Sequence, residues 1–217
     1  MAYRARMRLT QELSQLIFPT RCFGCNRIGL AICSDCRSEW HPHYYLTHVS
    51  SLKVHSAVIY SPTARKILLA AKENGINAAD NLIIDSIIHV LSMANFTGSN
   101  ISLVPIPSSS MSKRRRGRSF VVDIVERIAR QTSLPMNNSL HLIRPVRDQS
   151  RLRAMQRSLN VDGAMSLKPG VIPRADLVLI DDVVTTGATL REAARALTAA
   201  GCHVIGSVTA CVAQPLR

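Results

Sequence analysis

The stretch VLIDDVVTTGATLREAARAL, residues 178–197, decides the fold of this chain. An apolar run is followed at once by two aspartates. After two valines come two threonines, a glycine and a third threonine, and then a helical pattern. Packing explains the apolar residues of a buried strand, but it does not explain two carboxylates at its end. Because α/β sheets place ligands at the carboxyl ends of their strands, this order predicts a binding site between a strand and a helix.

The residues of this stretch offer hydrogen-bond acceptors first and donors second. The first amides of a helix lack intrahelical partners, and the helix dipole adds positive potential there, so the threonine-glycine loop is expected to bind an anion. A ribose 5-phosphate has the matching pattern, with hydroxyls for the carboxylates and a phosphate for the loop. The predicted binding residues are Asp181, Asp182, Thr185, Thr186, Gly187, Ala188 and Thr189.

Two alternatives compete with this interpretation. In the plainer one, Thr186 only caps the helix and both aspartates are solvated at the end of the strand, although a cap needs only one of these residues. In the other, the strand is a Walker B strand whose terminal acid holds Mg²⁺. That motif requires a G-x-x-x-x-G-K-[ST] loop upstream, and the sequence has none.

The wider pattern of the chain predicts an α/β fold. From residue 101 onward, short apolar runs alternate with helical patterns, which is typical of a parallel sheet covered by helices on both faces. Strands are expected at 56–61, 101–107, 176–182 and 203–212, and helices at 8–17, 62–72, 79–94, 120–132 and 187–201. Gly75 and Asn77 are expected in the turn between the second and third of these helices.

Two C-x-x-C pairs, separated by seven residues, lie near the N-terminus at Cys22, Cys25, Cys33 and Cys36. Two matched pairs in a module with almost no core of its own favour a structural Cys₄ zinc site. A redox dithiol and paired disulfides are the alternatives, but neither explains why the two pairs match. Four cysteine ligands leave no open position for catalysis, so the expected role of Zn²⁺ is structural.

The charge of the chain favours polyanionic partners. Lys and Arg total 27 against 14 for Asp and Glu, a formal charge of +13, which suits nucleic acid or phosphorylated metabolites but also a merely soluble basic protein. Aromatic residues make up only 4%, which argues against a base-stacking platform. No apolar segment follows the N-terminal arginines, and the longest apolar run, at 82–91, is too short to span a bilayer. The protein is therefore expected in the cytoplasm, without a membrane partner.

Two further stretches are rich in cations. Residues 105–117, PIPSSSMSKRRRG, directly follow a strand, and residues 144–164, RPVRDQSRLRAMQRSLNVDGA, carry five arginines among few apolar anchors. The first run could equally be a solvated face or a nucleic-acid patch, and the second an ordinary surface loop.

The stretch VLIDDVVTTGATL, residues 178–190, resembles the phosphoribosyl pyrophosphate (PRPP) signature of type I phosphoribosyltransferases. The resemblance implies PRPP as ligand, with bound Mg²⁺, and a pyrophosphate loop at Ser108, Ser109 and Ser110. Residues 144–164 resemble the mobile loop that closes over substrate in this fold, with Gln149, Arg157 and Asn160 as the matching positions.

The order of the motifs resembles the ComF family from about residue 16 to residue 212. It runs from FPTRCFGCNR through the second C-x-x-C, AAKENG, VPIP with its basic run, and Gln149 to Asn160, to the PRPP signature. This implies an N-terminal helix and zinc finger at 1–45 and a phosphoribosyltransferase domain at 50–217. Partners implied are PRPP or a related nucleotide, and single-stranded DNA beside a competence helicase.

This chain departs from the ComF pattern in three places, one of which is a shortened segment before Gln149. The family's Arg-Gly-Phe-Asn-Gln is replaced by residues 116–120, Arg-Gly-Arg-Ser-Phe, and its Leu-Lys-Tyr-Arg-Gly by residues 71–75, Ala-Lys-Glu-Asn-Gly. Two hypotheses follow. In the first, the protein is a phosphoribosyltransferase that acts through positioning and charge stabilisation. In the second, it is a non-catalytic nucleotide- or DNA-binding component of a DNA-processing complex, which the loss of the Asn-Gln pair favours.

Overall fold

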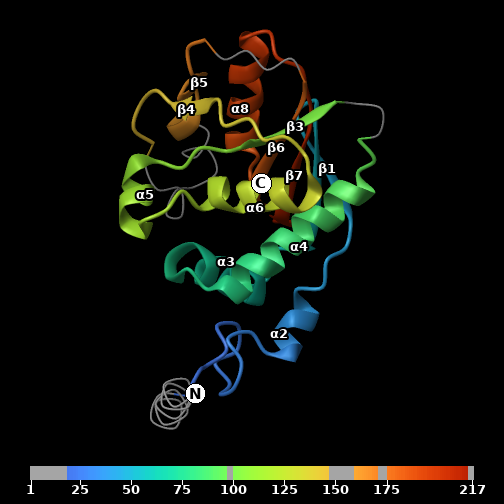
Figure 1. The fold of residues 1–217 in the computed structure, drawn as a ribbon, viewed down its shortest axis with the longest axis vertical. Coiled ribbons are helices and arrows are strands. Elements are labelled where there is room, and N and C mark those ends of the chain that lie inside the picture. The colour runs from blue at the N-terminus through green and yellow to red at the C-terminus, as the bar shows by residue number, and fades with distance from the viewer. Residues whose placement is uncertain (1–18, 97–99, 147–158, 171–174, 215–217) are drawn as a thin grey trace, which may run out of the picture.

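The structure is a computed structural model that describes residues 19–96, 100–146, 159–170 and 175–214 (Figure 1). The helix expected at 8–17 lies outside these residues. The elements are, in chain order, α2 (Ser34–Glu39), β1 (Tyr45–Val49), β2 (Leu52–Ile59), α3 (Pro62–Asn74), α4 (Asn77–Met93), β3 (Ile101–Pro105), α5 (Ser110–Arg116), α6 (Phe120–Thr132), β4 (Leu140–Leu142), β5 (Met165–Leu167), β6 (Asp176–Val184), α8 (Ala188–Ala199) and β7 (Val204–Val212).

The main sheet has five strands in the order β1-β2-β7-β6-β3. The three pairs β2-β7, β7-β6 and β6-β3 are parallel, as expected, whereas β1 runs antiparallel to β2 at the edge. Strand β1 was not expected. The turn between β1 and β2 is made by two serines, and Ser50 takes the left-handed conformation at φ 55°, so the sequence carries none of the Asn-Gly or Gly-Gly signals of a hairpin.

Two cores cover the two faces of the sheet. Along β6, Val178 and Ile180 pack in one core with helices α3, α4 and α6, while Leu177 and Leu179 pack in the other core with α8. Successive residues of a strand point to opposite faces, so a continuous apolar run is what a doubly covered strand requires. The expectation of helices on both faces is confirmed.

The helix boundaries follow local signals. Helix α3 begins at Pro62 with the hydroxyl of Ser61 accepting from the amide of Ala64 at 3.1 Å, and it ends at Gly75 in the left-handed conformation. Gly75 lies in the turn between α3 and α4 as expected, whereas Asn77 is already the first residue of α4. Helix α6 spans the expected residues. Helix α5 is a difference, because its run of four cations was expected to lie in a loop. Glu73 of α3 binds two of these cations, and this contact offsets the repulsion between them.

The short strands β4 and β5 pair in antiparallel fashion and bring together the two ends of the arginine-rich region. Strand β5 also packs beside α8, where the amide of Met165 donates to Glu192 at 2.9 Å. Within the described part of the chain, no helix has the length and apolar character needed to cross a membrane.

The cysteine module packs against α3 and α4, at the lower end of the view in Figure 1. Trp40, only 1% exposed, donates its indole N–H to the hydroxyl of Ser86 at 2.8 Å and to the carbonyl of Leu82 at 3.2 Å. Lys66 of α3 donates to the carbonyl of Gly24 at 2.9 Å. The module thus shares the core of the larger domain instead of building one of its own.

Candidate functional site

A cavity of about 720 Å³ lies where β6 leads into α8. Every binding residue predicted in the opening stretch lines it: Asp181, Asp182, Thr185, Thr186, Gly187, Ala188 and Thr189. Helix α3, helix α5 and the β4-β5 region supply much of the remaining wall. The structure thus brings these seven residues to the wall of one cavity, and their role in binding stays a prediction.

The loop before α8 depends on Gly187. This glycine has a φ of 69°, and a Cβ placed on it would lie 2.3 Å from Cγ2 of Val49, so both its backbone conformation and the approach of β1 exclude a side chain. The contact with β1 is a reason for glycine at this position that the sequence alone does not reveal. Thr186 accepts from the amide of Ala188 at 3.3 Å, so its side chain helps to order the loop.

The two aspartates lie inside β6, because the strand continues two residues further, to Val184. Asp182 is only 5% exposed, and its Oδ2 accepts from Nζ of Lys72 at 2.8 Å. Asp181 is half-buried and accepts from the amide of Asp182 at 2.9 Å. The alternative in which both carboxylates are solvated at the end of the strand is therefore wrong for Asp182.

Burial and the charge of Asp182 act in the same direction on the pKa of Asp181 but in opposite directions on the pKa of Lys72. Burial raises the pKa of Asp181 well above its ordinary value, and the neighbouring carboxylate of Asp182 raises it further. Burial lowers the pKa of Lys72, but the carboxylate of Asp182 outweighs this and raises that pKa above its ordinary value. The structure thus holds a charged lysine against a buried carboxylate at the wall of the cavity.

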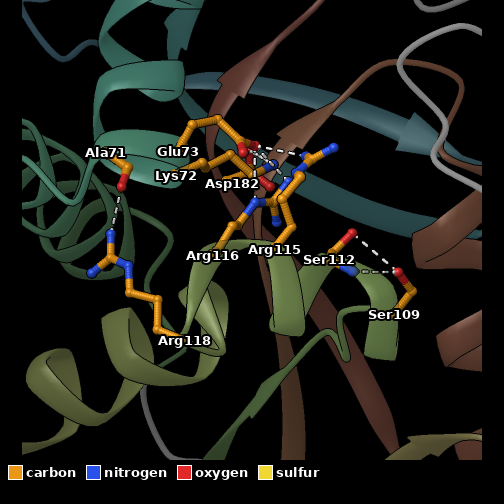
Figure 2. Close-up of polar contacts among 9 residues, drawn as sticks. All are labelled: Ala71, Lys72, Glu73, Ser109, Ser112, Arg115, Arg116, Arg118 and Asp182. Carbon is orange, nitrogen blue, oxygen red and sulfur yellow. Dashed lines mark hydrogen bonds and ion pairs between the residues drawn. The ribbon is translucent and has the colours of Figure 1, made fainter.

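The five cations of residues 113–118 fall into three groups with different surroundings, and Arg118, the third group, is described below. Arg115 and Arg116 line the cavity, and both bind Glu73 of α3 (Figure 2). Lys113 and Arg114 are exposed, and they are not among the residues that line the cavity. The segment is therefore not one uniformly solvated face, because Arg116 is largely buried against Glu73.

Arg118 belongs to the packing of the fold. It donates to both carboxylate oxygens of Asp80, at 2.8 and 2.9 Å, and to the carbonyl of Ala71 at 2.6 Å. Its guanidinium also lies 5.0 Å from the ring centroid of Phe120. In Figure 2, Arg118 points away from the group formed by Glu73 and Arg116. The departure from the ComF pattern at residues 118–120 thus places a structural ion pair where the family has Phe-Asn-Gln.

The predicted pyrophosphate loop is only partly brought to the cavity. Ser108 and Ser109 line it, whereas Ser110 is exposed as the first residue of α5 and does not. Ser109 caps this helix by accepting from the amide of Ser112 at 3.2 Å.

Two of the three predicted mobile-loop positions, Gln149 and Arg157, lie outside the described residues. The third, Asn160, offers its backbone carbonyl to Arg144 at 3.2 Å and is not among the cavity-lining residues. Val146 and Val161, from the same region, do line the cavity.

The four predicted cysteine ligands are brought together. The Sγ atoms of Cys22, Cys25, Cys33 and Cys36 all lie within 4.8 Å of one another, so they could hold a metal ion. In a tetrahedral site with metal-sulfur bonds of about 2.3 Å, the sulfur atoms are about 3.8 Å apart.

The backbone around these four sulfur atoms also favours the binding of a metal ion. The amide of Cys33 donates to Sγ of Cys22 at 3.3 Å, and a Cβ on Gly24 would lie 2.5 Å from Sγ of Cys36. Burial raises the pKa of the Cys22 thiol, but hydrogen bonds with the backbone of Cys33, Cys25 and Gly24 outweigh it and lower the pKa to about 6. The pKa of the neighbouring Cys36 is raised, because of its burial and its hydrogen bonds with the other three thiols. A thiolate is the form of cysteine that binds a metal.

Sequence reasoning missed Lys72 and Glu73 as site residues. One signal existed for Lys72, because the AAKENG stretch keeps the lysine of the corresponding ComF motif. Glu73 carried no signal, since its partners Arg115 and Arg116 lie 42 and 43 residues away on another helix.

The chain belongs to the phosphoribosyl transferase domain family, whose family model matches residues 80–215. The type I phosphoribosyltransferase fold, with a mainly parallel sheet flanked by helices, is therefore confirmed. Helix α3, which carries Lys72 and Glu73, lies outside the matched residues.

The resemblance to the ComF family is also confirmed. The chain matches Competence protein F from Haemophilus influenzae with 29% identity over 107 residues, which are 48% of this chain and 47% of the relative. The match thus spans about half the length of that protein. The four-cysteine cluster near the N-terminus is the other part of the expected ComF architecture.

Solved phosphoribosyltransferases are more distant in sequence. Orotate phosphoribosyltransferase from Aeropyrum pernix is 15% identical, with a TM-score of 0.41 over 81% of this chain and 77% of that chain. Adenine phosphoribosyltransferase from Trypanosoma brucei, solved with AMP, pyrophosphate and ribose-5-phosphate, is 13% identical, with a TM-score of 0.42 over 84% and 82%.

Proposed function

We propose that this protein binds PRPP together with Mg²⁺ and transfers its phosphoribosyl group to a nitrogen nucleophile. The observation that carries the proposal is the single cavity wall on which the two aspartates and the threonine-glycine loop meet. Carboxylates suit ribose hydroxyls, and a loop that leads into a helix suits a phosphate. The same residues also suit a related nucleotide.

Each part of the ligand has a proposed set of partners. The 5-phosphate binds Thr185 to Thr189, and the ribose hydroxyls bind the carboxylates of Asp181 and Asp182. The contact with Lys72 is made by Oδ2 of Asp182, so the other oxygen can still accept. The Mg-pyrophosphate group lies near Ser108 and Ser109. Transfer then depends on positioning and on stabilising charge at the reacting carbon, without a covalent nucleophile.

The four-cysteine cluster is proposed to hold one structural Zn²⁺. Four thiolates fill the tetrahedral coordination that zinc prefers, so no position is open to substrate. The protein is expected to act in the cytoplasm, where thiols stay reduced.

Calorimetry with PRPP and Mg²⁺ tests the ligand assignment. Asp181→Asn should weaken binding by about 1.5–3 kcal/mol, because a charge-assisted hydrogen bond becomes a neutral one. Asp162→Asn is the matched control, since Asp162 is exposed and does not line the cavity. Affinity of the folded Asp181→Asn variant equal to that of the native protein would overturn the assignment. Release of pyrophosphate in the presence of candidate bases separates an enzyme from a binding protein.

The second candidate function is binding of single-stranded DNA in a DNA-processing complex, beside a competence helicase and without turnover. It is supported by the name of the relative, Competence protein F, and by the formal charge of +13. If exposed cations contact phosphates, the logarithm of the binding constant should fall by about 0.7 per contact for each ten-fold increase in salt concentration. Replacing Lys113 and Arg114 by Ala should flatten this slope, and an unchanged slope would remove α5 from any DNA interface.

A further inference from the structure

One face of helix α3 lines the cavity over about two helical turns. Arg65, Leu68, Leu69 and Lys72 are all lining residues, and the steps of three, four and seven residues from Arg65 place them on the same side of the helix. Tyr60, which directly follows β2, lines the cavity as well. The family model matches only residues that come after this helix, so the family comparison assigns no role to this wall.

Arg65 differs from the other cations of the cavity in its surroundings. Lys72 binds the carboxylate of Asp182, and two arginines of α5 bind Glu73. Arg65 is exposed, and within the part of the chain that the structure describes its guanidinium contacts neither a carboxylate nor another hydrogen-bond acceptor. A guanidinium at a cavity wall can donate two parallel N–H bonds to the carboxylate of a ligand.

Two leucines occupy the wall between Arg65 and Lys72. Leu68 is buried, whereas Leu69 keeps 40% of its surface exposed although it lines the cavity. An exposed leucine in a cavity can pack against the face of a flat ring, and ligand sites commonly combine such apolar surface with a few polar groups. Arg65 and Lys72 are seven residues apart, about 10 Å along the helix axis, so an aromatic ring fits between the two charges.

Tyr60 adds a hydroxyl group to the same wall. Burial raises the pKa of its phenol, so the group is protonated at neutral pH and can donate a hydrogen bond. The charges of Arg65, Asp182 and Lys72 also act on this pKa, so the phenol lies near these three side chains. Its backbone amide donates to the carbonyl of Val212 at 2.8 Å, which holds the residue at the end of the sheet.

We propose that Tyr60, Arg65 and Leu69 form the subsite for the acceptor of the phosphoribosyl group, and that this acceptor is a planar nitrogen heterocycle with a carboxylate. The ring packs on Leu69, its carboxylate binds the guanidinium of Arg65, and the hydroxyl of Tyr60 donates to a polar atom of the ring. Lys72 ends this wall beside Asp182, which is proposed to bind the ribose. That the heterocycle is an acceptor rests on the proposed function, whereas its contact with Arg65 does not.

The test measures the binding of two pairs of probes to the full-length protein by calorimetry, with and without ribose 5-phosphate. The members of each pair share a ring and differ in charge: pyridine-3-carboxylate with pyridine-3-carboxamide, and uracil-6-carboxylate with uracil. In at least one pair, the native protein should bind the carboxylate about ten-fold more tightly, because the guanidinium then makes a charge-assisted hydrogen bond to an anion. Arg65→Gln should remove this preference.

Two further variants separate the contact with Arg65 from general effects of charge and folding. Arg114→Gln is the matched control, because it removes one charge at an exposed position that does not line the cavity, and it should keep the preference. Leu69→Ala should weaken both members of a pair by a similar factor, about three-fold or more, because it removes apolar contact and no charge. Equal affinity of the native protein for both members of each pair would overturn the subsite, and so would a preference that persists in Arg65→Gln.

Ribose 5-phosphate, which has no heterocycle, distinguishes this inference from the proposed function. If the native protein binds ribose 5-phosphate but prefers neither carboxylate, the acceptor subsite fails and the proposed function stands. If the preference for a carboxylate depends on Arg65 but ribose 5-phosphate does not bind, the subsite stands as a site for the heterocycle and the proposed function fails.

Discussion

The cysteine module and the ligand cavity are ordered in different ways. In the module, four sulfur atoms within 4.8 Å of one another come from one short segment, and a few buried side chains attach that segment to α3 and α4. In the cavity, the charged groups come from α3, α5 and β6, and contacts between distant residues hold them. The comparison teaches that the order of the module is expected to depend on the one metal ion that its four sulfurs could hold, whereas the cavity depends on the whole fold.

The largest expected effect concerns the ion. Cys36→Ser removes one ligand, and a structural zinc site contributes about 10–16 kcal/mol in zinc-finger peptides, so we expect stoichiometric metal to be lost and the module to detach. Trp40 is the only tryptophan of the chain, so its fluorescence should shift to longer wavelength as its buried ring enters water. Cys202→Ala, outside the cluster, is the control. Full metal content with unchanged emission in Cys36→Ser would contradict the assignment.

The second largest effect is expected when the buried ion pair between Lys72 and Asp182 is broken. Lys72→Met leaves Asp182 charged and buried without its partner, which should lower the free energy of unfolding by about 3–5 kcal/mol in urea titrations. Lys113→Met, at an exposed position, should change it little. The pKa of Lys72 is raised above 10.5, so the pair stabilises the native protein fully below that pH. This contribution disappears as the pH rises through the higher folded pKa, and the Lys72→Met variant should lack that alkaline loss.

A smaller effect is expected at the loop glycine. Gly187→Ala should cost about 2–4 kcal/mol, because it combines the left-handed backbone with overlap against Val49. Gly201→Ala is the matched control: it has a φ of 79° and no atom within 4 Å of the added Cβ, so it should show the backbone cost alone. Equal losses of stability in the two variants would mean that β1 does not support the loop. If the overlap with Val49 does contribute, adding Val49→Ala to Gly187→Ala should restore part of the lost stability.

The smallest effect is a pH dependence at Asp181. Its pKa is raised above 3.8, so the folded state holds the proton more tightly, and its contribution to stability falls as the pH rises from 3.8 to the folded pKa. Ribose hydroxyls donate more strongly to an ionised carboxylate than to a protonated carboxyl group, so affinity for ribose 5-phosphate should increase over the same rise in pH. The affinity for inorganic phosphate, measured over the same pH range, corrects for titration of the phosphate group of the ligand. The pH dependence of ribose 5-phosphate affinity that remains should be absent in Asp181→Asn.

The contrast between local sequence patterns and contacts between distant residues explains how much of the fold and of the site could be predicted from the sequence. The cysteine cluster and the phosphate loop are local patterns, and so are the parallel strands with their apolar runs, which is why each was predicted. The pair Lys72-Asp182 joins residues that are 110 positions apart in the sequence. The pair Arg118-Asp80 joins a residue between α5 and α6 to a residue of α4, 38 positions away. No local sequence pattern therefore predicts either pair. Helix α5 was missed because a run of cations is usually solvated, and its partner Glu73 lies on another helix.

Helix α3 contacts both regions. Lys66 binds the carbonyl of Gly24 beside the cysteine cluster, and Lys72 and Glu73 follow less than two turns later, at about 1.5 Å of rise per residue. A shift of this helix at one end therefore moves the charged pair at the other. If ligand binding and metal binding both favour the same position of α3, each must increase the affinity of the other by the same factor. A cell that supplies less metal to this protein would then also change how much of it is loaded with ligand.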